Sequence, residues 1–183
     1  MPDGSQGRPN LLVCRSIREG RLNLTESARK NLRKHTIRKT DITNYATDEL
    51  AEILQVSAER ARELRALIDF QQIPGVGIKF AEDLIFIGYY SIDSLKGLDG
   101  AKLVETFEEK KGYQIHSCVE DQFRLAVHFA NTGDRTKNWW DFTAERKKYR
   151  TENGYPQDRP TTLWHEVIPI KRMKQIAGKS VEQ

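Results

Sequence analysis

The stretch Ile73-Pro74-Gly75-Val76-Gly77 places two glycines between segments of helical pattern, and it decides the fold. Glycine takes positive φ at little steric cost and leaves the backbone bare on the outside of a turn. Pro74 fixes its own φ at a value that suits a tight turn. We expect the N–H groups of Gly75, Gly77 and the helix start after them to face outward, as a partial positive charge for an anion, with Lys79 beside them.

Apolar residues recur at helical spacing on both sides of this turn. Before it, residues 58–70 carry one apolar stripe, and Ser57 can serve as their N-cap. After it, the apolar series from Phe80 to Ile87 stops at Gly88, which suits a left-handed C-cap. Two short helices that meet at such a turn form a helix-hairpin-helix unit. The sequence therefore predicts this unit around residues 73–77.

The helical pattern occurs twice along the chain. Thr25 can cap the first helix of the earlier copy, and residues 48–54 form its second. A six-residue insertion near residues 109–114 explains why the shift between the copies grows from 53 to 59. We interpret the pattern as a duplication, with chance similarity of amphipathic helices as the alternative. The corresponding pairs are Ala28–Ala81, Leu50–Leu103 and Leu54–Phe107 at 53, then Leu64–Phe123 and Phe70–Phe129 at 59.

The first copy lacks the glycine turn. Residues 22–24 read Leu-Asn-Leu where Gly75, Val76 and Gly77 stand in the second copy, so this segment offers no equally bare backbone. Its helix instead carries a basic face. One interpretation is that the first copy supplies side-chain charge and the second supplies backbone N–H groups to one polyanion; a solvated helix face is the alternative. The basic residues are Arg29, Lys30, Arg33 and Lys34.

Charge is distributed in three blocks along the 183 residues. Residues 15–39 hold 9 basic and 2 acidic side chains, residues 41–142 hold 11 and 18, and residues 143–183 hold 9 and 5. The net charges are therefore +7, -7 and +4. Because phosphate attraction follows local positive charge, a nucleic acid would meet the first block or the tail before the acidic centre.

The carboxyl-terminal tail mixes aromatic and basic residues, and two roles stay open for it. Trp139 and Trp140 can act as stacking platforms beside phosphate-binding charge, or they can pin the tail onto the helical core. Pro156, Pro160 and Pro169 prevent one long helix, so we expect an extended wrap that ends near the basic cluster at residues 171–174.

The sequence contains no motif typical of a catalytic site, a metal site or a membrane span. Cys14 and Cys118 are far apart with no CxxC motif, and the four histidines lack metal-ligand spacing or a nucleophile partner. Lys79, Glu82 and Asp83 raise the idea of a base-excising glycosylase, but no matching Asp-containing loop follows the hairpin. No apolar run approaches the length of a membrane span. We therefore expect a cytoplasmic protein without enzymatic activity, cofactor, metal or membrane contact.

Four blocks between residues 73 and 140 resemble a known family. They are Ile73 to Gly77, residues 92–97 (Ile-Asp-Ser-Leu-Lys-Gly), residues 118–127 with Cys-Val and Phe-Arg-Leu-Ala-Val, and residues 137–141 (Lys-Asn-Trp-Trp-Asp). They are similar to small bacterial helix-hairpin-helix proteins named after a pathogenicity locus. This chain has Gly88-Tyr89-Tyr90 where that family usually shows Gly-Ile. The paired arrangement is more remotely similar to the carboxyl-terminal domains of the RNA polymerase alpha subunit and of a competence regulator, which implies DNA or polymerase contact.

The sequence thus predicts an all-α protein of tandem helix-hairpin-helix repeats in one compact domain with an extended carboxyl-terminal tail. We expect a disordered arm at 1–9, a degenerate basic repeat at 10–70, the glycine-hairpin repeat at 71–130 and the aromatic, basic tail at 131–183. The leading hypothesis is DNA-backbone binding without sequence specificity. Its residues are Gly75, Val76, Gly77, Lys79, Arg29, Lys30, Arg33 and Lys34. The alternative is a protein interaction module, for a partner or a second copy, that uses the acidic core and aromatic tail without a nucleic-acid role.

Overall fold

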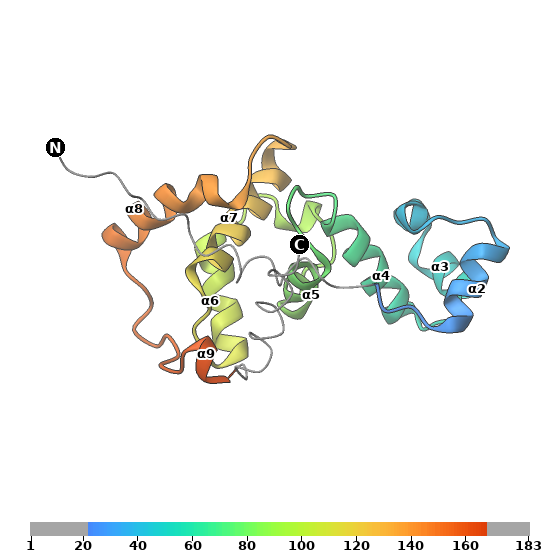
Figure 1. Cartoon of the computed structure of the whole chain (residues 1–183), viewed down its shortest axis with the longest axis horizontal. Helices are drawn as coiled ribbons and strands as arrows, with labels where there is room; N and C mark the ends of the chain where they lie inside the picture. Colours follow the sequence, from blue (N-terminus) through green and yellow to red (C-terminus); the bar gives the residue numbers. More distant parts are fainter. Residues whose placement is uncertain (1–21, 168–183) are drawn as a thin grey trace, which may run out of the picture.

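The computed structural model describes residues 22–167, and this part of the chain is built from helices (Figure 1). It contains no strand; a lone bridge pairs Gln114 with Leu163. The predicted all-α class is confirmed. The arm predicted for residues 1–9 and the basic cluster at 171–174 lie outside the described residues. The elements are α2 (Glu26–Lys34), η2 (Lys39–Asn44), α3 (Thr47–Leu54), α4 (Ala58–Phe70), α5 (Ile78–Phe86), η3 (Asp93–Leu95), α6 (Gly100–Lys111), α7 (Ser117–Thr132), η4 (Trp139–Phe142), α8 (Thr143–Asn153) and α9 (Trp164–Val167).

The helix ends fall where local side-chain chemistry places them. The Thr25 hydroxyl accepts a hydrogen bond from the Ala28 N–H at 3.1 Å, and the Ser57 hydroxyl accepts one from the Arg60 N–H at 3.2 Å. Each bond satisfies one of the unpaired donors at a helix start. Helix α5 ends as predicted at Gly88, whose φ of +103° is a conformation that favours glycine.

The order of elements repeats once, which supports the inferred duplication. Helix α2, η2, α3 and α4 are followed by α5, η3, α6 and α7 in the same sequence. The predicted pairs are all buried in the core: Ala28, Leu50, Leu54, Leu64 and Phe70 in the first copy, and Ala81, Leu103, Phe107, Phe123 and Phe129 in the second. The insertion near residues 109–114 makes α6 longer than α3 and lengthens the connection that follows it.

The caps refine the register between the first helices of the two copies. The N-caps are Thr25 in α2 and Gly77 in α5, and the positive-φ residues that end the helices are Thr36 and Gly88. Both pairs are 52 residues apart, so these helices correspond at a shift of 52, and only the later elements correspond at 53. Thr25 is therefore the counterpart of Gly77.

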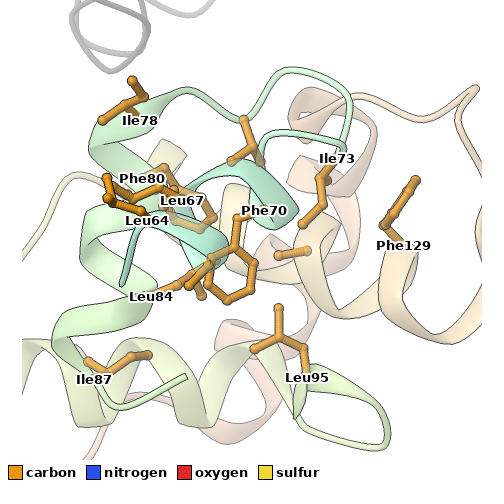
Figure 2. Packing of buried hydrophobic residues seen from close by; sticks show 14 of the residues in the cluster. Leu64, Leu67, Phe70, Ile73, Ile78, Phe80, Leu84, Ile87, Leu95 and Phe129 are labelled. Atoms are coloured by element: carbon orange, nitrogen blue, oxygen red, sulfur yellow. The ribbon is translucent and has the colours of Figure 1, made fainter. Parts of the chain in front are cut away.

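One continuous apolar core runs from Leu22 to Phe142. Helix α4 connects its two ends, because it packs against α3 and η2 on one side and against α5 on the other (Figure 1). At its carboxyl end the fully buried ring of Phe70 lies between Leu84 of α5 and Leu95 of η3 (Figure 2). The hairpin thus follows a helix end that is anchored in the buried core.

The carboxyl-terminal tail differs from the extended wrap that the prolines indicated. Up to residue 167 it contains η4 and the eleven-residue helix α8, and the segment from Gly154 to Leu163 is irregular. Helix α8 buries no apolar residue, so it has no apolar stripe from which the sequence could have predicted it. Charged contacts, described below, hold it against α6 and α7.

Candidate functional site

The hairpin between α4 and α5 is a closed turn with an exposed tip. The Ile73 N–H donates to the Phe70 carbonyl and the Val76 N–H donates to the Ile73 carbonyl, both at 3.1 Å. Ile73 and Val76 are buried, whereas Gly75 is exposed. Gly75 has the predicted positive φ, +78°. Gly77 does not: its φ of -98° and ψ of 174° are extended values that any residue adopts, so its role is to leave the helix start uncovered.

Two equivalent helix starts differ in how their N–H groups are satisfied. At α2, the Thr25 side chain accepts one of them. At α5, Gly77 has no side chain to do so. The N–H groups of Gly77, Ile78 and Lys79 have no acceptor among residues 22–167. The start of α5 therefore carries the partial positive charge of an open helix terminus, which favours an anion.

Lys79 is only partly available for a ligand. Its ammonium lies 2.7 Å from a carboxylate oxygen of Glu82, one turn further along α5. The two side chains are 57% and 43% exposed, and such exposed pairs contribute little to stability and rearrange readily. A phosphate at the helix start would compete with Glu82 for this cation.

The basic face of α2 stands free of acidic partners. Arg29, Lys30, Arg33 and Lys34 are all exposed, and none forms an ion pair with any residue that the structure describes. Glu26 is the helix's own acid and lies in its first turn. These four side chains therefore present charge to solvent without internal neutralisation.

A groove of about 1020 Å³ joins the two copies of the repeat. It brings Arg29 of α2 together with Ile78, the first residue of α5. Lys39, Gln71 and Gln72 also line it, and sequence reasoning missed them as site residues, because only the fold brings η2 beside the turn. Lys30, Arg33 and Lys34, and likewise Gly75, Val76, Gly77 and Lys79, are not in its lining. The described lining residues are Leu22, Arg29, Lys39, Thr40, Thr43, Asn44, Ile68, Gln71, Gln72 and Ile78.

Three arginines of the tail form ion pairs with four acids of the acidic block. Arg146 lies 2.7 Å from Asp121, and Arg159 lies 2.6 Å from Glu108. Arg150 bridges α6 and α7, at 3.0 Å from Glu120 and 3.1 Å from Glu105. Glu108, Glu120 and Asp121 are each only 1% exposed. We call these seven residues the arginine clasp: Glu105, Glu108, Glu120, Asp121, Arg146, Arg150 and Arg159.

Asp83 on α5 is an acid outside the clasp. Burial raises its pKa to about 6, the ammonium of Lys111 at 3.9 Å opposes this rise, and the neighbouring Glu82 adds to it. The side chain is 29% exposed.

Within residues 22–167 no group of three His, Cys, Asp or Glu side chains is arranged to hold a metal ion. No helix in that range has the length and apolarity needed to cross a membrane.

Comparison with known proteins gives one match. A family model described as Pathogenicity locus (Cdd1) matches residues 47–148, which is more than half of the chain. The matched segment begins with α3, includes the hairpin and ends inside α8. It contains all four sequence blocks on which the resemblance was based, whereas α2 lies outside it. No curated protein and no solved structure matches the chain.

Proposed function

The chain belongs to the pathogenicity locus family (Cdd1), and from this premise we propose that it is a non-enzymatic protein that binds the DNA backbone largely without sequence specificity. The family description names no ligand and no reaction. The proposal rests on the groove that is lined by both Arg29 of α2 and Ile78, the first residue of the uncapped helix α5. An open helix start and unpaired cations on one groove are complementary to a chain of phosphates.

The two copies contribute different kinds of contact in this proposal. The N–H groups around Gly75 and Gly77, with Lys79, bind one phosphate at the hairpin formed by residues 73–77. The side chains of α2 bind further phosphates along the same strand, and Lys39 at the groove adds to them. Contacts with phosphates position a protein on DNA but carry no sequence information, so little sequence preference is expected.

The arginine clasp argues against the basic tail as a DNA-binding surface and against the acidic block as a surface for a protein partner. Arg146, Arg150 and Arg159 are engaged by carboxylates, so they are poorly placed to bind phosphates. The same contacts occupy the buried acids that a basic protein partner would need. Three arginines thus offset part of the -7 balance of residues 41–142, which weakens the support for the interaction-module alternative.

Fluorescence polarisation with a labelled duplex tests the proposal. Neutralising four or five phosphates predicts that the logarithm of affinity falls with the logarithm of salt at a slope of roughly -4. Binding that is absent at low salt, or insensitive to salt, would refute it. A pull-down from native lysate, with and without nuclease, gives the independent check: a protein partner that survives nuclease would favour the interaction module instead.

A further inference from the structure

The loop at residues 133–138, between α7 and η4, lies beside the hairpin. Resting on the proposed function, we propose that this loop and Trp140 form a second DNA contact, one that binds an unpaired stretch of strand next to a duplex. Arg135 and Lys137 would contact its phosphates, and Trp140 would stack on an unpaired base. None of these three residues belongs to the hairpin or to α2.

The loop occupies the same place in the second repeat as the hairpin does in the first. The hairpin follows α4, the last helix of the first copy, and the loop follows α7, the last helix of the second. The two are in contact: Arg135 Nη1 donates to the Gln72 carbonyl at 3.3 Å. Ile73 of the hairpin and Phe129 of α7 belong to the same buried cluster (Figure 2). A strand bound at the hairpin would therefore pass close to the loop.

The loop is held in one shape by its own hydrogen bonds. Gly133 follows α7 with a φ of +68°, and the Asp134 carboxylate accepts from the N–H and the hydroxyl of Thr136 at 2.8 and 2.7 Å. The Asp141 carboxylate accepts from the Asn138 N–H at 2.8 Å. A preformed loop loses little conformational entropy when a ligand binds.

The acids of this segment accept hydrogen bonds inside it, whereas its two cations are exposed. Asp134 and Asp141 are occupied by the hydrogen bonds just described. Arg135 and Lys137 are exposed, and neither forms an ion pair within residues 22–167. Arg135 donates to the Gln72 carbonyl and lies 5.6 Å from the centre of the Phe129 ring, which holds its guanidinium next to the hairpin, where a phosphate would share it.

The sequence left open whether the two tryptophans pin the tail to the core or stack on bases. In the structure each of them suits one of these roles. Trp139 is 3% exposed and anchors η4 in the core. Trp140 is 43% exposed and its ring rests edge-on against Trp139, with the ring centroids 5.4 Å apart. A large aromatic ring that is held by a buried neighbour and open to solvent is a stacking platform. Bases inside a duplex already stack on both faces, so such a ring selects an unpaired base.

Polarisation assays with three probes test the inference: a blunt duplex, the same duplex with a single-stranded overhang, and the single strand alone. The wild-type chain should bind the overhang duplex about fivefold or more tightly than the blunt one, as expected for one stacked base. Trp140→Ala should abolish this preference and leave blunt-duplex affinity unchanged, whereas Trp140→Phe should keep most of it. The double variant Arg135→Gln, Lys137→Gln should reduce overhang binding by a similar factor.

Two controls make the result specific. Lys147→Gln with Lys148→Gln removes two exposed cations from α8 and should leave the overhang preference intact. Quenching of tryptophan fluorescence by the overhang probe should disappear in Trp140→Phe. Equal affinity for blunt and overhang duplexes, or a preference that survives Trp140→Ala, overturns this inference while DNA-backbone binding stands. Failure of all three probes to bind refutes both.

Discussion

Helix α2 and the tail from α8 to Arg159 are both rich in basic residues, yet their arginines differ in whether they form ion pairs. The four cations of α2 meet no acid among the described residues, whereas Arg146, Arg150 and Arg159 are bound to buried carboxylates of α6 and α7. A count of Lys and Arg along the chain treats these segments alike. Only the fold shows which charges are used for stability and which remain available to a ligand.

The family match covers only part of this comparison. It contains the four acids of the clasp and Arg146, whereas Arg150 and Arg159 lie after its last residue. Helix α2 lies before its first residue. The family match therefore does not set these two basic segments apart; the contacts of their side chains do.

Breaking the clasp should have the largest effect, and that effect should be on stability. Arg150→Ala removes a cation that is 7% exposed and leaves Glu120 and Glu105 with fewer partners. Removing one member of a buried ion pair costs about 3–5 kcal/mol. Urea unfolding followed by circular dichroism measures the loss. Lys148→Ala, the exposed neighbour on α8, is the matched control, and an equal loss there would refute the distinction.

Neutralising the basic face of α2 should change DNA affinity and leave stability unchanged. Replacing Arg29, Lys30, Arg33 and Lys34 with Gln should leave stability unchanged, because they are exposed and Gln forms helix comparably well. Duplex affinity should fall roughly thirtyfold or more, and the salt slope should shrink by about 3. The control carries the same charge change elsewhere, at Lys102, Lys110, Lys147 and Lys148. If both variants bind equally, net charge alone explains the affinity.

Asp83 should have an effect on stability that is smaller than that of the clasp. It is a half-buried acid, and the ammonium of Lys111 lies 3.9 Å away. Its folded pKa of about 6 exceeds the ordinary 3.8, so the folded state holds this proton more tightly than the unfolded state. Its contribution to stability is therefore most favourable below about pH 4 and is lost as pH rises to 6. Asp83→Asn should be about 1–2 kcal/mol more stable than wild type at pH 7 and lose that advantage at pH 4. Urea unfolding at both pH values checks this, and an advantage that grows at pH 4 would contradict it.

Giving α5 the cap that α2 has should produce the smallest effect. Gly77 has an extended backbone that Ser can adopt, and a Ser hydroxyl would accept an N–H group of the first turn. Gly77→Ser should raise stability by a few tenths of a kcal/mol and weaken duplex binding roughly three- to tenfold. Thermal unfolding and polarisation measure the two changes. Tighter binding by this variant would show that the open helix start is not used.

Much of the fold could be predicted because its signals are local. Caps at Thr25 and Ser57, the glycine after α5 and the apolar stripes depend on neighbours within a few residues, and the structure confirms them. Helix α8 could not be found this way. Its order depends on Arg146 and Arg150 reaching carboxylates that lie 25 and 30 residues earlier in the chain.

The candidate site was predictable only in its parts. The glycine turn and the basic face can be read from residue types, but the groove that Arg29 and Ile78 both line depends on how η2 and α4 pack. The shift of 52 between α2 and α5 became apparent only from the caps. It replaces the expected pairing of Leu24 with Gly77 by the pairing of Thr25 with Gly77, which explains why one helix start is closed and the other open.

The most direct test of the central claim follows backbone amide signals by NMR while a short duplex is added to the isotope-labelled chain. The account predicts shifts at Gly75, Gly77 and Lys79 and along Arg29 to Lys34, with the amides of α8 unmoved. Shifts confined to α8 and the arginine clasp, or no shifts with DNA in excess, would contradict it.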